Sequence, residues 1–110
     1  MHKLRINPEA LADLKSVSAY INEEIGNPGA ARAVVSMLMA SFRSLKANPL
    51  SGKRLSALID IDSDYYYIIS VSYMILYKAD SETVSVYRIL NGRKDYAKVL
   101  FGMSQEEEAQ

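Results

Sequence analysis

The residues best suited to chemistry are basic side chains near the carboxyl end of the chain. From Ser85 to Phe101 one acid, Asp95, accompanies four bases, which are Arg88, Arg93, Lys94 and Lys98. Arg93 follows a glycine at the end of a predicted strand, where a guanidinium could hold a phosphate through two hydrogen bonds. Tyr96 could stack on a base or act as an acid. Such groups suit RNA cleavage, in which a 2′-hydroxyl attacks the adjacent phosphate and extra negative charge must be stabilised.

Each candidate also has a structural interpretation. Arg93 is equally well explained as a surface arginine, and Tyr96 as an anchor of the last segment to the core. Arg88 lies within a predicted strand, so it either reaches an open face of the sheet or pairs with an acid. Lys53 and Arg54 fall in a predicted loop, and Lys53 could be a general base only if burial lowered its pKa. The catalytic candidates are Arg93, Arg88, Tyr96 and Lys53, and the candidate contacts to RNA or another target are Arg54, Lys94 and Lys98.

Composition narrows the class of protein. A chain of 110 residues with 49% hydrophobic and 24% charged residues is typical of one globular domain. The absence of cysteine and the single histidine, His2, argue against disulfides and zinc sites, so we expect neither metal nor cofactor. No apolar run is long enough for a bilayer span and no secretory signal is evident, so we expect a cytoplasmic protein with no membrane partner.

The charges are unevenly distributed along the chain. The formal net charge is zero, which fits poorly with binding to ribosomal RNA through many phosphates. Bases gather at 43–54 and 85–101, whereas acids gather at 60–64 and 106–108. This segregation allows a local anion site on a neutral molecule, because at physiological salt a charge is felt only over about 8 Å.

Two helices are predicted in the first half of the chain, after a short strand at Lys3–Ile6. Asn7-Pro8 and Asn27-Pro28 are both helix-start signals, and Gly26 ends the first helix. Apolar residues then recur at spacings of three and four up to about Ala47. Because the joint is so short, the helices should form an antiparallel hairpin.

The second half is predicted to be a β-meander. The segment Leu50–Asp64 is expected to be a loop, and the strands are expected at Tyr65–Ile69, Tyr73–Ala79 and Val84–Leu90, where Tyr, Ile and Val are frequent. A short helix or extension should follow. The prediction is an α+β fold of order β-α-α-β-β-β, with the hairpin on one face of an antiparallel sheet. The other face is expected to be open and rich in tyrosine.

We expect one domain over residues 1–102 and a disordered acidic tail over 103–110. Several segments, in order from about residue 3 to residue 101, also match a known family. They are Ile6–Ala10 with Asp13-Leu14, Tyr20-Ile21, Asn27-Pro28, Asn48-Pro49 with Gly52, Tyr73–Tyr77, and Arg88–Tyr96. The chain resembles the RelE/ParE toxin superfamily in the order and spacing of these segments, most closely at Asn-Gly-Arg-Lys-Asp-Tyr, where the family typically has His-Gly-Arg-x-Asp-Tyr.

The resemblance implies the toxin of a type II toxin–antitoxin system, silenced by a cognate antitoxin. Members of the superfamily similar to RelE cut mRNA on the ribosome, whereas those similar to ParE poison DNA gyrase without a recognised active site. Two departures weaken the nuclease alternative: Met74 stands where such nucleases usually carry an arginine, and Asn91 replaces the histidine of the ending. We therefore favour a ParE-like gyrase inhibitor, with a ribosome-dependent endoribonuclease and an inactive, antitoxin-binding relative as alternatives.

Overall fold

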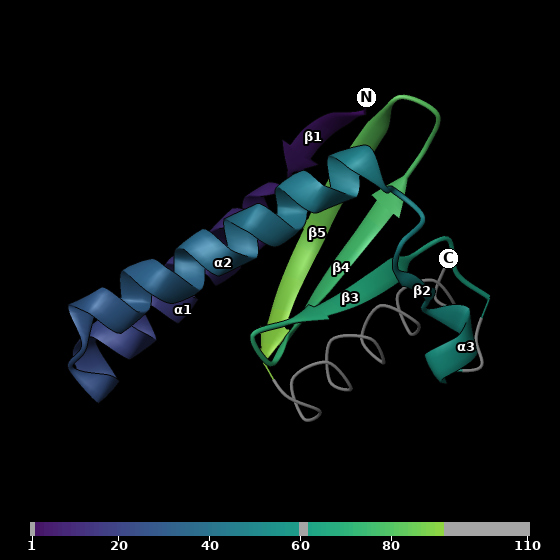
Figure 1. Cartoon of the computed structure of the whole chain (residues 1–110). Coiled ribbons are helices and arrows are strands. Elements are labelled where there is room, and N and C mark those ends of the chain that lie inside the picture. Colours follow the sequence, from purple (N-terminus) through teal and green to yellow (C-terminus); the bar gives the residue numbers. More distant parts are fainter. Residues whose placement is uncertain (1, 60–61, 92–110) are drawn as a thin grey trace.

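A strand and a hairpin of two helices form the first half of the molecule (Figure 1). The computed structural model describes residues 2–59 and 62–91. Strand β1 spans Lys3–Ile6, helix α1 spans Pro8–Ala19, the π-helical turn η1 spans Tyr20–Ile25, and helix α2 spans Pro28–Ala47. The two helices run side by side in opposite directions, and this confirms the predicted hairpin.

The two Asn-Pro signals start their helices by different means. The Asn27 side chain accepts a hydrogen bond of 3.0 Å from the Ala30 N–H, as a capping residue should. Asn7 occupies the equivalent position before α1, but its side chain makes no capping bond. Its backbone N–H instead donates to the Val86 carbonyl at 2.9 Å and extends the pairing of β1. Gly26 has a φ of 76°, a left-handed conformation that favours glycine, and there the first helix ends.

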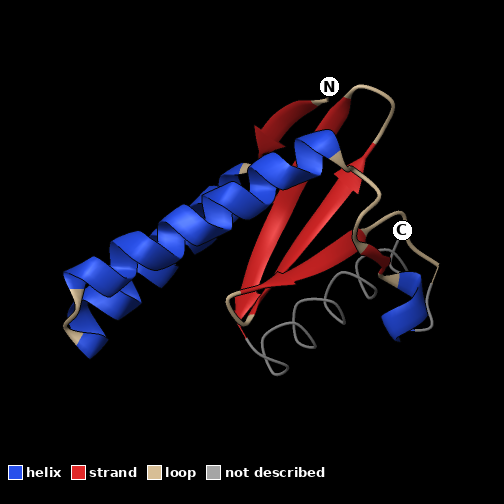
Figure 2. Ribbon diagram, in the orientation of Figure 1, coloured by secondary structure: helices blue, strands red, loops and turns tan. Residues whose placement is uncertain are grey.

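The sheet has five strands in the order β1-β5-β4-β3-β2 (Figure 2). The strands after the hairpin are β2 (Lys53–Arg54), β3 (Tyr66–Ser70), β4 (Tyr73–Ala79) and β5 (Thr83–Asn91). Strand β1 runs parallel to β5, and the other neighbours are antiparallel. The predicted loop at Leu50–Asp64 is wrong in part, because it contains β2 and the short helix α3 (Ser56–Ile59).

The core lies between the hairpin and the sheet. Leu38 and Phe42 of α2 are fully buried against Ile75 of β4 and Val86 of β5. Burial of such side chains stabilises the fold by about 1.5–3 kcal/mol each before entropic costs. The α+β architecture predicted from the sequence is therefore confirmed within the described residues.

A β-bulge in β5 changes which side chains face the helices. Tyr77 pairs with Val86 and Leu76 pairs with Arg88, so Tyr87 is an extra residue between them. As a result, Ile89 follows Val86 into the core. Simple alternation, which groups Arg88 with Val86, is wrong past the bulge.

Tyrosines lie on both faces of the sheet, contrary to the expectation that they gather on the open one. Tyr77 is fully buried with Leu45 of α2, on the helix side. On the opposite face Leu55 and Leu76 form a separate apolar cluster flanked by Tyr65 and Tyr67. That face is therefore partly apolar and partly covered, because Leu55 packs on it from the segment after β2.

Candidate functional site

The structure describes three of the seven residues predicted for the site, and it separates them into two places. Lys53 and Arg54 form β2, and Arg88 lies near the end of β5. Strands β3 and β4 lie between β2 and β5, so these side chains start from strands about 14 Å apart. The remaining candidates, Arg93, Lys94, Tyr96 and Lys98, lie outside the described residues, as do the predicted terminal helix and the acidic tail.

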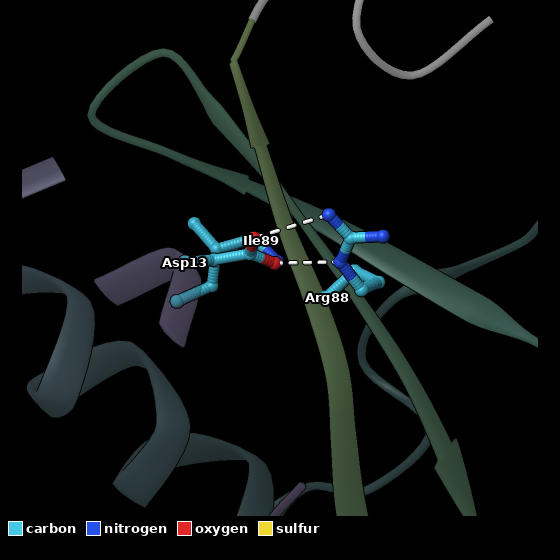
Figure 3. Close-up of polar contacts among 3 residues, drawn as sticks. All are labelled: Asp13, Arg88 and Ile89. Carbon is cyan, nitrogen blue, oxygen red and sulfur yellow. Dashed lines mark hydrogen bonds and ion pairs between the residues drawn. The ribbon is translucent and has the colours of Figure 1, made fainter. Parts of the chain in front are cut away.

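Arg88 is held by Asp13 of helix α1 (Figure 3). The Arg88 Nε donates to Asp13 Oδ2 at 2.7 Å, and its Nη2 donates to Oδ1 at 3.1 Å. Asp13 Oδ2 also accepts a hydrogen bond of 2.9 Å from the Ile89 backbone N–H. Strand β1 pairs with β5 only as far as Val86. The carboxylate therefore takes the place of a neighbouring strand where β1 no longer reaches.

The pairing fixes the charge and orientation of Arg88. The hydrogen bond to Asp13 raises the pKa of Arg88 above its ordinary value, while partial burial acts in the opposite direction. Side-chain exposure is 32% for Arg88 and 18% for Asp13, so the pair is half-buried. Of the two alternatives for Arg88, the structure shows pairing with an acid. A guanidinium already neutralised on two of its N–H groups is a weak phosphate clamp.

Strand β2 is fastened to the sheet through Tyr77. The Tyr77 hydroxyl donates to the Pro49 carbonyl at 2.9 Å and accepts from the Gly52 N–H at 3.0 Å. A Cβ at position 52 would lie 2.5 Å from the Tyr77 hydroxyl oxygen and 2.6 Å from the Tyr67 carbonyl oxygen, so only glycine fits there. Burial raises the pKa of Tyr77, which keeps the hydroxyl protonated. These contacts place Lys53 and Arg54 directly beside β3.

Lys53 and Arg54 are exposed and point to opposite sides of the sheet, since they are consecutive residues of one strand. Arg54 lines an open groove of about 380 Å³, which we call the Lys78 groove. The lining residues are Arg54, Asp64, Tyr66, Lys78, Ala79, Asp80, Thr83, Ser85 and Tyr87. The sequence analysis did not single out Lys78, although a lysine inside a strand of otherwise apolar and aromatic residues is a usable signal.

His2, the one histidine, is bound at the start of β1. Its Nε2 lies 2.9 Å from the Asp80 carbonyl oxygen. Within residues 2–59 and 62–91, no group of three or more His, Cys, Asp or Glu side chains is arranged to hold a metal ion. In the same part of the chain, no helix is both long enough and apolar enough to span a membrane.

Comparisons with known proteins agree with this fold. The family model described as ParE toxin of type II toxin-antitoxin system, parDE, matches residues 4–96. A solved structure titled "Chromosomal ParDE TA system from P. aeruginosa" contains a similar chain, with a TM-score of 0.69 and 18% identity over 84% of this chain and 98% of that one. No curated protein matches. Since the family model spans most of the chain, this protein belongs to the ParE toxin family of type II toxin–antitoxin systems.

Proposed function

We propose that this protein inhibits growth by acting on DNA gyrase in the bacterial cytoplasm, and that a cognate antitoxin binds it and keeps it silent. The family match over residues 4–96 carries this proposal, because that family is defined by toxins of ParDE modules. The structural relative comes from a system whose title names the paired module. An antitoxin partner is the expected counterpart of such a fold.

The described chemistry favours gyrase over RNA cleavage. The Arg88 guanidinium is occupied by Asp13, and Met74, at the position where RelE-like nucleases carry arginine, is 4% exposed. His2 is bound to a backbone carbonyl at the start of β1. General acid–base cleavage of RNA needs a proton acceptor and a proton donor on either side of one phosphate. Among the described residues, Lys53 and Arg54 on one strand and Arg88 on another do not make such a pair.

Controlled induction of the chain in a bacterial host tests the proposal. We expect growth arrest, relief of the arrest by co-expression of the adjacent antitoxin gene, and accumulation of cleaved gyrase–DNA complexes. Messenger RNA cut at codon boundaries without gyrase–DNA complexes would identify a ribosome-dependent endoribonuclease instead. Absence of arrest by the folded chain would leave only a role as a partner of the antitoxin.

A further inference from the structure

The Lys78 groove holds two cations against aromatic rings. The Lys78 Nζ lies 4.4 Å from the centre of the Tyr65 ring and 5.5 Å from that of Tyr87. Those two rings meet edge to face, with centres 5.2 Å apart and planes at 88°. The Arg54 guanidinium lies 5.8 Å from the centre of the Tyr66 ring. Attraction between a cation and a ring face fixes each charge in position before any ligand arrives.

Neither cation is paired with a carboxylate. Among the described residues, no acid lies within 4.0 Å of Arg54 or Lys78, and the one ion pair of that part of the chain joins Arg88 to Asp13. The absence is notable because Asp64 and Asp80 line the same groove. A positioned cation without a counter-ion in a partly enclosed groove is ready to receive a negative group, since rings on either side reduce competition from water.

Asp80 is already engaged by the turn between β4 and β5. Its Oδ1 accepts hydrogen bonds of 2.8 Å from the Glu82 N–H and 2.7 Å from the Thr83 N–H. These two bonds lower the pKa of Asp80, so the carboxylate stays ionised at neutral pH. A fixed negative charge at one end of the groove disfavours a polyanion such as RNA or DNA, whose affinity depends on many neighbouring phosphates. It is compatible with a polypeptide that presents one or two carboxylates among neutral or basic residues.

We propose that the Lys78 groove binds acidic side chains of an extended segment of the cognate antitoxin. Lys78, between Tyr65 and Tyr87, receives one carboxylate, and Arg54 receives a second through its paired N–H groups. Thr83 and Ser85, which line the groove, supply hydroxyl groups that can bond the backbone of the segment. This inference rests on the proposed antitoxin partnership, and it assigns to that partner a site and a charge.

Titration of the purified toxin with the antitoxin encoded beside it, followed by calorimetry at low and moderate salt, tests the proposal. We expect Lys78→Gln to weaken binding about tenfold and Arg54→Gln to weaken it by a similar factor, as found when one partner of an interfacial charge pair is removed. Both variants should also reduce the salt dependence of the dissociation constant. Lys78→Arg, which keeps the charge, should bind within about threefold of wild type.

Lys53→Gln is the matched control, because Lys53 is exposed on the same strand but points to the opposite side of the sheet. Arg54 is exposed, so Arg54→Gln tests the groove even if Lys78→Gln lowers stability. Equal binding by wild type, Lys78→Gln and Arg54→Gln would overturn the groove while leaving the partnership intact. Failure of the wild type to bind the antitoxin would overturn both. Loss of affinity for a single-stranded oligonucleotide, with antitoxin binding unchanged, would identify a nucleic-acid site and also overturn the proposal.

Discussion

One carboxylate, that of Asp13, joins the first helix to the last described strand. It accepts two hydrogen bonds from the Arg88 guanidinium and one from the Ile89 backbone N–H. The bulge at Tyr87 makes this arrangement possible, because it turns Ile89 into the core and leaves Arg88 beside α1. Asp13 therefore supports the strand that leads into the predicted site residues at 93–98.

Replacing Asp13 by alanine should destabilise the protein. The substitution leaves the Ile89 N–H without its acceptor and the half-buried guanidinium without its counter-ion, at an expected cost of about 2 kcal/mol. Urea denaturation of Asp13→Ala and wild type measures the difference. Lys15→Ala, an exposed change one turn position away on the same helix, should alter stability by less than about 0.5 kcal/mol. A loss no larger in Asp13→Ala than in Lys15→Ala would show that the ion pair contributes nothing.

Arg93 is the residue that we predict to be needed for toxicity. It follows Gly92 in the ending that most resembles the superfamily, and its charge is suited to a surface contact with the target. We expect Arg93→Ala to relieve growth arrest while keeping antitoxin binding nearly unchanged. Arg5→Ala, which removes an exposed arginine from β1, should remain toxic. Full arrest by a folded Arg93→Ala protein would remove this residue from the functional set.

Among the elements, β2 depends on a contact that the sequence pattern did not reveal. Two residues are too few to show alternation, and the strand is held by the Tyr77 hydroxyl between Pro49 and Gly52. The same reason explains why α3, with four residues, was expected to be loop. The long helices and the strands β3 to β5 could be predicted because their apolar spacing repeats several times.

Tyr77→Phe should lower stability by about 1–2 kcal/mol, because the Gly52 N–H and the Pro49 carbonyl each lose a buried partner. Thermal and urea denaturation measure the loss. Tyr20→Phe is the control, since Tyr20 is 53% exposed on η1, and it should leave stability unchanged. A Tyr77→Phe protein as stable as wild type would mean that the hydroxyl does not hold the segment before β2.

The effect of Tyr77 should also depend on pH. Burial raises the pKa of Tyr77 above 10.0, so the folded protein keeps the hydroxyl protonated at pH values where the unfolded chain ionises. Its contribution is complete below the unfolded pKa of about 10 and is lost as the pH rises through the folded value. The difference in stability between wild type and Tyr77→Phe should therefore narrow between about pH 8 and about pH 11. A difference that stays constant or grows would contradict the burial of a neutral hydroxyl.

Side-chain placement was harder to predict than the elements. Alternation along β5 fails at Tyr87 because the bulge adds a residue, and no local signal marks the bulge in the sequence. The pairing of Arg88 was one of two open alternatives, since its partner lies 75 residues earlier on α1. Lys78 was missed because its neighbours Tyr65 and Tyr87 come from other strands. Contacts between distant segments decide all three cases.

At the scale of the whole molecule, a neutral chain carries its charges in separate places. The helical hairpin packs on one face of the sheet, the Asp13–Arg88 pair connects that hairpin to β5, and the Lys78 groove holds two cations without an acidic partner. A protein of this kind is suited to binding other proteins through defined patches, rather than to holding a long nucleic acid by its overall charge.

DNA gyrase activity measured with the purified toxin tests the central claim most directly. Relaxed plasmid, ATP and gyrase are incubated with increasing toxin, and supercoiled and cleaved DNA are separated on a gel. We predict dose-dependent loss of supercoiling with accumulation of gyrase-bound cleaved DNA, both reversed by the antitoxin. Undiminished supercoiling at saturating, folded toxin would contradict the proposed target.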